Sequence, residues 1–418
     1  MRPFDTSEYP EAILVQVTAE RVVAFPLPVV EAPPPAQPRP RKSFLGFVAG
    51  VIRTVLGAIA SGIEGLFGIA CLIFGLAVLA ALPIFQFLSL GYLLESGGRV
   101  ARTGRLRDAF IGIRMAARIG GVVLGCWLTL LPLRFASGLA RAAQIIDPDG
   151  DAAHAWRVVL MIAIPLAALH LLATVARGGR LRLFLWPFNL LWLVRQLWRG
   201  GYYARTRDAA WVVFVDLRLP YYFWLGLRGF VAALAWLIVP VSLIALGRSM
   251  PIFGFVGALL LAWVLFYLPF LQIRLAAQNR FWAGFERKAV RAEFTRAPWA
   301  FAVAFLVTLL TALPLYLLKI ELVPAEAAWL PSLVFIAFIF PARVLTGWAL
   351  GRANRREQYR HWFFRWTGRL PLLPAVAFYV LVVYFTQFTS WNGIWSLYEQ
   401  HAFTLPVPFV GQIGRAHV

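Results

Sequence analysis

Four polar side chains lie inside or beside long apolar stretches, where they could do more than pack. His170 lies within the apolar stretch 158–176, Arg134 lies near the end of the preceding one, and Gln86 and Gln272 border two others. An ionisable group inside a membrane is costly to bury and is therefore a candidate for binding a proton or a ligand. For His170 the alternative is a hydrogen-bonded packing role. Arg134 can extend to the interface instead, and glutamines often hold helices together.

A run of arginines and tryptophans forms a second set of candidates. Residues 181–199 read LRLFLWPFNLLWLVRQLWR, and the uncharged core of this run, 183–194, is too short to cross a bilayer. Indoles prefer the headgroup level, and each arginine near an anionic surface contributes about 1 kcal/mol of attraction. We expect a helix that lies in the inner interface or dips in and returns; alternatively, the arginines only enforce topology. The candidate headgroup ligands are Arg182, Arg195, Arg199, Arg205, Arg207, Trp186, Trp192 and Trp198.

Motifs for metal or cofactor chemistry are missing from the sequence. Asp147, Asp149 and Asp151 resemble the start of a calcium loop, but Gly150 comes two positions early and Val158 occupies the place of the bidentate glutamate. An acidic turn is the simpler interpretation. The chain also lacks phosphate-loop, dinucleotide, zinc-protease and serine-hydrolase motifs. We therefore expect no metal and no cofactor, and a non-enzymatic role is favoured over an enzyme.

The composition is that of a membrane protein. Hydrophobic residues make up 61% of the 418 positions, charged residues make up 14%, and the formal net charge is +21. Soluble domains are about 45–50% apolar and about 25% charged. A basic chain can bind nucleic acid or an anionic membrane. Because the arginines alternate with long apolar stretches and no nucleic-acid module is present, a lipid bilayer with anionic lipids is the expected partner.

Eight stretches are long and apolar enough to form spanning helices, which need about 20 mostly apolar residues. A ninth, 44–64, could form a hairpin with the first, because Gly57, Ser61 and Gly65 continue a stripe of small residues that favours close helix packing. Arg53 argues instead for a helix in the membrane plane. The sequence predicts an all-α, polytopic bundle of eight or nine spans with amphipathic interfacial helices. The eight stretches are 66–91, 120–140, 158–176, 229–247, 252–273, 298–318, 327–348 and 371–389.

The connecting segments alternate between long basic ones and short ones that are poor in positive charge. Four basic segments contain 28 of the 40 lysines and arginines. Positively charged loops stay in the cytoplasm. We therefore expect a multi-pass protein of the cytoplasmic membrane with these segments on the cytoplasmic side. The four basic segments are 95–118, 177–228, 274–296 and 343–369.

The two ends of the chain differ from the membrane domain, 43–412. Residues 1–42 are rich in proline and contain no long apolar run, so a disordered tail is expected. The last six residues, 413–418, resemble the translation of a common DNA sequencing adapter. We expect them to be an artefact of sequencing.

Two similar motifs indicate an internal repeat. LPIFQ at 82–86 recurs as LPFLQ at 268–272, and each motif precedes a basic segment and then another apolar stretch. The repeated unit would be a span, a basic elbow and a second span. Repeats of this kind are frequent in transporters, although they are also a simple way to enlarge any membrane protein.

The first basic segment also resembles part of a known family. Residues 90–110 combine a Gly-Tyr-Leu sequence with spaced arginines. The residues concerned are Gly91, Tyr92, Leu93, Arg99 and Arg102. This pattern resembles an elbow in an uncharacterised family of bacterial polytopic membrane proteins. The resemblance is local and lacks the acidic-tryptophan stretch of that family, so it implies a bacterial membrane lineage and no particular activity.

Three functions are consistent with these features. The first is a non-enzymatic scaffold or sensor of the bacterial inner membrane that interacts with lipid through its arginines and aromatics. The second is a transporter with a site at the bilayer midplane, indicated by the repeat and His170. The third is a membrane-embedded enzyme acting on a phosphorylated lipid, which would need carboxylates and arginines to converge at the inner face.

Overall fold

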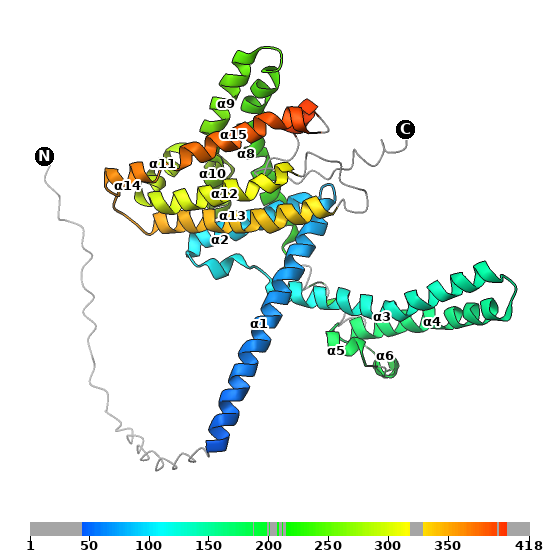
Figure 1. Cartoon of the computed structure of the whole chain (residues 1–418). Helices are drawn as coiled ribbons and strands as arrows, with labels where there is room; N and C mark the ends of the chain where they lie inside the picture. The colour runs from blue at the N-terminus through cyan, green and yellow to red at the C-terminus, as the bar shows by residue number, and fades with distance from the viewer. Residues whose placement is uncertain are drawn as a thin grey trace, which may run out of the picture. The chain divides into compact units, whose positions relative to one another are not determined.

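The computed structural model describes residues 44–186, 188–198, 200, 207–208, 211, 215–317, 329–390 and 393–398. The proline-rich tail and the last six residues lie outside these ranges. By its internal contacts the chain divides into two units, Met1–Gly57 and Ala58–Val418. All regular secondary structure in the described part of the chain is helical, as Figure 1 shows.

The helices confirm an all-α, polytopic membrane bundle. Seven are long and apolar enough to cross a membrane, and the bent pair of α9 (Pro251–Leu265) and α10 (Leu268–Gln278) would make an eighth. The seven candidate spans are Thr54–Ala81, Ile113–Ile146, Asp151–Ala176, Leu219–Leu246, Pro298–Tyr316, Leu330–Asn354 and Trp362–Thr389. They belong to α1 (Phe44–Ala81), α3 (Ile113–Ile146), α4 (Asp151–Ala176), α8 (Leu219–Leu246), α12 (Pro298–Leu317), α13 (Leu330–Asn354) and the pair α14 (Trp362–Thr367) and α15 (Leu372–Thr389).

The predicted ninth span is wrong, because its residues continue into the first span without a turn. Helix α1 runs unbroken from Phe44 to Ala81 over 38 residues. Gly65 lies inside this helix with no heavy atom of another element within 4 Å of a Cβ built on it, so its small size serves no close packing there. A single glycine weakens a helix by only about 1 kcal/mol and does not end it.

The first predicted span, 66–91, is also wrong at its C-terminal end. Helix α1 stops at Ala81, and α2 begins only at Gln86. Pro83 lies in this break; proline has no N–H for the helix ladder and disfavours helical backbone in the residue before it. Ile84 takes a left-handed backbone with φ 70°. The apolar stretch is therefore divided between a long helix and a short, separate one.

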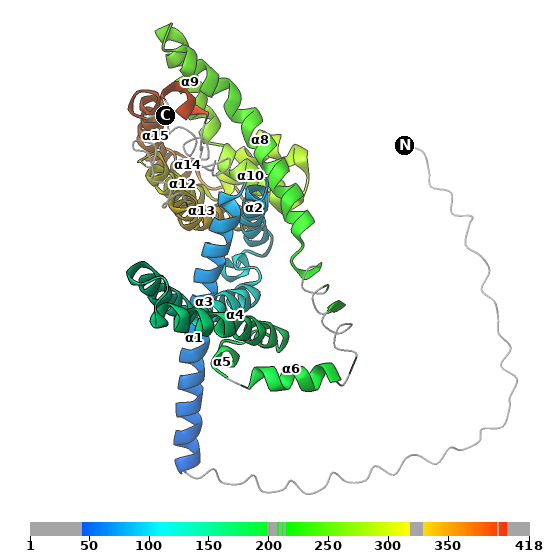
Figure 2. The ribbon, with the colours of Figure 1, turned by 90° about the vertical axis from the view of Figure 1, so that its right-hand side faces the viewer.

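Helix α2 (Gln86–Thr103) lies at the centre of the bundle, packed against α8, α10 and α13. Figures 1 and 2 both show these helices side by side. A Cβ at Gly91 would overlap the backbone carbonyl of Tyr222 on α8, and one at Gly226 would overlap that of Phe87 on α2. Small residues that let backbones approach are how helices associate in lipid, where the hydrophobic effect between helices is weak.

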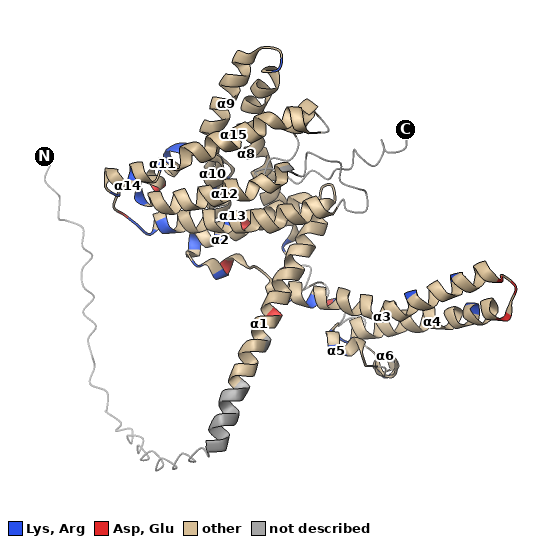
Figure 3. Ribbon diagram, in the orientation of Figure 1, with Lys and Arg blue, Asp and Glu red and all other residues tan. Residues whose placement is uncertain are grey.

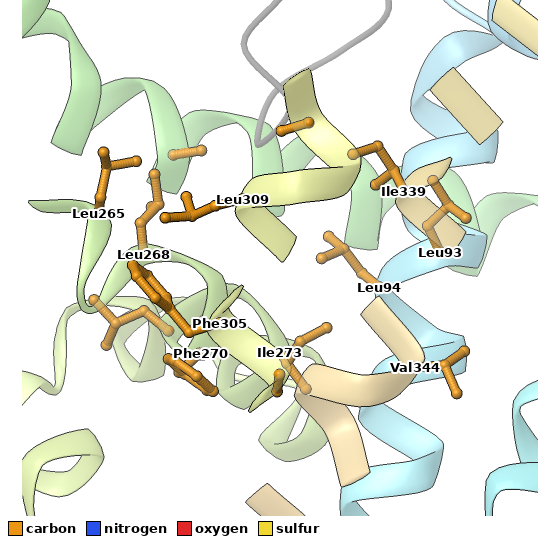
Figure 4. Packing of buried hydrophobic residues seen from close by; sticks show 14 of the residues in the cluster. Leu93, Leu94, Leu265, Leu268, Phe270, Ile273, Phe305, Leu309, Ile339 and Val344 are labelled. Carbon is orange, nitrogen blue, oxygen red and sulfur yellow. The ribbon is translucent and has the colours of Figure 1, made fainter. Parts of the chain in front are cut away.

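An apolar core fills the space among α2, α9, α10, α12 and α13. Figure 4 shows Leu94, Ile273, Phe305 and Ile339 converging from four of these helices. All four side chains are at most 2% exposed. Lipid-facing positions on the same helices are also apolar, so composition alone does not separate the core from the outer surface.

The segments that follow α1 and α9 have the same succession of backbone states. Each of α2 and α10 ends before a residue in the left-handed region, Gly104 with φ 69° and Asn279 with φ 52°. An extended arginine follows, Arg105 or Arg280, and then a 3-10 helix, η1 (Leu106–Ala109) or η2 (Phe281–Phe285). The LPIFQ and LPFLQ motifs are therefore each followed by the same order of backbone conformations.

Helices α3 (Ile113–Ile146) and α4 (Asp151–Ala176) form an antiparallel pair, joined by the turn at Asp147–Gly150. Two short helices follow, α5 (Leu181–Phe184) and α6 (Asn189–Trp198). The run of arginines and tryptophans therefore contains two short helices, and its location in the membrane interface stays a prediction. In Figure 3, long helices are mostly uncharged and basic residues gather near α11 (Arg287–Arg296) and α14.

Candidate functional site

The bend between α9 and α10 opens an aromatic groove. The two helices meet at 40° across Phe266 and Tyr267, directly ahead of Pro269 in the first turn of α10. Because proline supplies no N–H, it is accommodated at the start of a helix and not in its interior. The break places large aromatic side chains beside α11 (Arg287–Arg296) and α12.

The groove has a volume of about 400 Å³ and a mostly apolar lining. Phe270 stacks on Phe301 of α12 with ring centroids 4.3 Å apart, and Phe266 stacks on Phe305 at 5.5 Å. Stacked pairs of this kind hold flat rings in fixed positions. The lining consists of Trp263, Phe266, Tyr267, Phe270, Val290, Arg291, Phe294, Phe301, Phe305, Arg369, Leu372 and Leu373.

Two arginines line this otherwise apolar groove, Arg291 on α11 and Arg369 ahead of α15. Arg291 is exposed, and the Cζ of Arg369 lies 5.0 Å from the centroid of the Phe294 ring. Within the described residues neither arginine forms an ion pair with a carboxylate. The groove therefore combines apolar walls with two positive charges that no acidic side chain among the described residues neutralises, which suits an amphiphile with an anionic head.

A separate group of arginines is neutralised by carboxylates. Glu95 on α2 accepts a hydrogen bond from Arg102 Nη2 at 2.5 Å and another from the Tyr221 hydroxyl of α8 at 2.8 Å. Arg274 on α10 pairs with both Glu286 and Glu293. Each of these arginine–carboxylate pairs joins residues at most 19 positions apart, whereas the Tyr221 hydroxyl reaches Glu95 across 126 positions. Arg99, four residues after Glu95, approaches the same carboxylate at 3.9 Å, which is the longer of the two arginine contacts.

His170 lies in a polar cluster that fastens α5 and α6 to α4. Its Nε2 is 3.0 Å from the backbone oxygen of Phe184. Asn189, fully buried, donates to the Thr174 hydroxyl at 2.9 Å and accepts from Arg177 at 3.0 Å. This arrangement is that of the hydrogen-bonded packing role, the alternative to proton or ligand binding.

Most of the predicted headgroup residues that the structure describes are exposed on or beside α5 and α6. Trp186 and Trp198 are exposed, as are Arg182 and Arg195. Trp192 is half-buried and stacks under Arg177, whose Cζ lies 5.6 Å from the ring centroid. Arg207 pairs with Asp208, while Arg199 and Arg205 lie outside the described residues.

The other intramembrane polar candidates separate into three environments. Arg134 is exposed on α3. Gln86 begins α2, and its Oε1 is buried without a partner in the described structure. Gln272 is 1% exposed and accepts a hydrogen bond from Arg343 of α13 at 2.5 Å. Only Gln272 connects helices as expected for a glutamine between spans.

Sequence reasoning missed the groove, although its signals are local. Phe266 and Phe270 are four residues apart across a proline break, and Phe301 and Phe305 have the same spacing on the next long apolar helix. This spacing places Phe301 and Phe305 on one face of α12, whereas Phe266 lies in the break ahead of α10, which carries Phe270. What cannot be read from spacing is that the two pairs meet each other.

Comparisons with known proteins add no relative. No family model matches the chain, and no significant match is found among curated proteins or among solved structures.

Proposed function

We propose that this chain is a non-enzymatic integral protein of the bacterial cytoplasmic membrane that binds an anionic lipid in the aromatic groove. The observation that supports it is the pair of Arg291 and Arg369, which lack ion-pair partners in the described residues and line a mostly apolar groove of about 400 Å³. In this proposal the basic segments, including α11 and α14, face the cytoplasm, as positively charged loops do.

The two parts of the groove would contribute differently to binding. Each methylene of an acyl chain that leaves water contributes about 0.8 kcal/mol, although this gain is small for a chain that leaves the bilayer instead. Affinity over bulk lipid therefore depends on the headgroup. A phosphate between two arginines gains about 1 kcal/mol or more from each, and bidentate contacts add geometric selectivity.

Neutral lipids serve as the reference in this proposal. Phosphatidylcholine carries a phosphate but also a compensating choline cation, whereas phosphatidylglycerol has a net negative charge. Two arginines without carboxylate partners favour the lipid with net charge. The expected preference is therefore for phosphatidylglycerol, and the arginines, not the aromatic walls, decide it.

The test is lipid retention by the purified full-length protein in neutral detergent, measured by native mass spectrometry. Phosphatidylglycerol and phosphatidylcholine are supplied in equal amounts. The wild type should retain phosphatidylglycerol preferentially, and the double variant Arg291→Ala with Arg369→Ala should lose this preference. Arg118→Ala, at an exposed arginine of α3, is the matched control and should behave as the wild type.

A second variant separates the groove from general surface charge. Leu373 is 57% exposed and lines the groove, so Leu373→Trp adds bulk there without disturbing the core. It should reduce retention of both lipids while leaving the charge unchanged. Equal phosphatidylglycerol preference in the wild type and in the double arginine variant would overturn the proposal.

A further inference from the structure

A second cavity, smaller and more polar, lies where α2, α10, α11 and α13 meet. Its volume is about 180 Å³. The lining includes residues from both segments that follow the LPIFQ and LPFLQ motifs, with α13 completing the wall. These residues are Ala101, Arg102, Arg274, Ala277, Gln278, Glu293, Leu350 and Asn354. Arg102, Gln278 and Asn354 are exposed, so the cavity is accessible from the surface.

One carboxylate oxygen at this cavity has no partner. Glu293 is 5% exposed, and its Oε1 accepts a hydrogen bond from Arg274. Its Oε2 is buried and makes no hydrogen bond within the described structure. A buried acceptor without a donor costs about 1–3 kcal/mol, and more when the group is charged. A ligand that donates a hydrogen bond to Oε2 would recover this cost.

The two arginines of the cavity have donors to spare. A guanidinium has five N–H groups. Arg274 uses Nε and Nη2 on Glu286, at 3.0 Å and 2.8 Å, and Nη1 on Glu293. Arg102 gives Nη2 to Glu95 and shares Nη1 between the backbone oxygens of Ala276 and Ala277, at 3.2 Å and 3.3 Å. Its Nε has no hydrogen bond in the described structure.

The ligand that fits must therefore accept from arginines and donate to a carboxylate at the same time. A metal or organic cation could contact Glu293 Oε2, but it would offer no acceptor to the N–H groups of Arg102 and Arg274 that the ion pairs leave over. A fully deprotonated oxyanion can accept from them, but it would bring its own oxygens against Glu293 Oε2 with no proton between. A phosphate that keeps one hydroxyl satisfies both demands, because its P–OH donates and its other oxygens accept.

We propose that this cavity binds a phosphate group that retains one P–OH, with its unprotonated oxygens on Arg102 and Arg274 and its hydroxyl donating to Glu293 Oε2. The group belongs to inorganic phosphate, a soluble phosphate monoester or a lipid that ends in a phosphate monoester. The site is independent of the aromatic groove and of the proposed function. Because α2, α10 and α11 all contribute, the bound phosphate would join the two similar segments.

Phosphate and sulfate provide the test, because both are tetrahedral and near pH 6 inorganic phosphate carries at least one P–OH whereas sulfate carries none. Binding to the full-length protein in neutral detergent is measured by isothermal titration calorimetry at this pH. Phosphate should bind at least about tenfold more tightly than sulfate, the factor expected for one buried hydrogen bond. Equal affinities, or no binding of phosphate, would overturn the proposal.

Glu293→Gln tests the role of the carboxylate. The glutamine amide can donate to sulfate, so the variant should bind sulfate and phosphate with similar affinity. An unchanged preference for phosphate in a folded Glu293→Gln protein contradicts the assignment. Asn354→Leu provides a variant that leaves every described ion pair intact, since it only replaces an exposed amide at the cavity with an apolar side chain. It should weaken phosphate binding while thermal unfolding stays as in the wild type, and unweakened binding would count against the site.

Lipid competition identifies the source of the phosphate. In nanodiscs, phosphatidic acid presents a phosphate monoester, whereas phosphatidylglycerol presents a diester without a P–OH. Competition with inorganic phosphate by phosphatidic acid alone assigns the site to a lipid, and absence of competition by either assigns it to a soluble phosphate. Competition by both lipids equally would contradict recognition of the hydroxyl. Arg291→Ala with Arg369→Ala should leave phosphate binding unchanged, which distinguishes this site from the groove.

Discussion

Arg343 of α13 donates a hydrogen bond through Nη1 to Oε1 of Gln272 on α10, at 2.5 Å. Both side chains are almost fully buried, 3% and 1% exposed. The Nε and Nη2 of Arg343 have no partner in the described part of the chain, and no carboxylate there forms an ion pair with it. Desolvation of a guanidinium costs several kcal/mol, and one neutral amide offsets only part of it. Burial of the Arg343 guanidinium therefore lowers the stability of the fold, and loss of its hydrogen bond to Gln272 would lower the stability further.

Replacing Gln272 and replacing Arg343 should affect the stability of the protein in opposite directions. Gln272→Leu leaves the arginine buried without its one described hydrogen bond, and we expect a loss of about 3 kcal/mol. Arg343→Met removes the buried charge and keeps most of the volume, so stability should be unchanged or higher. Reversible unfolding in mixed micelles with increasing dodecyl sulfate measures both. A larger loss for Arg343→Met than for Gln272→Leu would contradict this account of the contact.

The close approach of α2 and α8 should make Gly226 intolerant of a methyl group. A Cβ there overlaps the Phe87 carbonyl, so Gly226→Ala forces the two backbones apart and should cost about 2 kcal/mol or more. Gly62 of α1 has open space around it and is the matched control. Gly62→Ala should be neutral or stabilise slightly, since alanine favours helix by up to about 1 kcal/mol. The midpoints of thermal unfolding of the two variants are compared. Equal midpoints would argue against a close approach of α2 and α8 at Gly226.

Glu293 should make stability depend on pH. Burial, opposed by Arg274, raises the pKa of this carboxyl above its ordinary value of 4.5. The folded state then holds its proton in a range where the unfolded state has lost it. The stabilisation that comes from protonated Glu293 is fully present below pH 4.5 and is lost as pH rises through the elevated pKa of this carboxyl group.

A variant without the carboxyl group should lack this loss of stability. The unfolding midpoint of Glu293→Gln, compared with the wild type, should improve steadily as pH rises above 4.5. The matched control is Glu357→Gln, at an exposed position between α13 and α14. If the Glu293→Gln and wild-type profiles run parallel across this range, the buried carboxyl group does not titrate as described.

Asn189 should hold α6 against α4. Its side chain makes hydrogen bonds to Arg177, Thr174 and the Leu183 carbonyl, the last at 2.5 Å. Asn189→Ala leaves those groups without a partner and should lower the local opening free energy by about 2 kcal/mol. Hydrogen exchange of residues 181–198 measures it, with Gln196→Ala on the same helix as the control. Unchanged protection in Asn189→Ala would show that packing alone holds the helix.

Much of the fold was predictable because it depends on local composition. A stretch of about 20 apolar residues has few alternatives to a helix in lipid, and each of the eight predicted stretches overlaps a different candidate span or the bent pair. The errors lie at residues 44–91, where hydropathy shows an apolar run but not where a helix continues or stops. Pro83 ends α1 near Ala81, and nothing ends it at Gly65. Proline was the more informative residue there, since glycine in an apolar helix is tolerated.

By itself, the sequence determined that this is an all-α membrane protein and which stretches form its helices, because helix formation in lipid depends on residues within a few turns of one another. The tertiary structure alone decided which polar side chains meet. Tyr221 reaches Glu95 across 126 positions, and Arg102 reaches the backbone of Ala276 across 174. Such contacts depend on which helices pack together at close-approach glycines and proline breaks. The local sequence pattern does not show which helix will be the neighbour at such a position. The aromatic groove and the phosphate cavity both belong to this second kind.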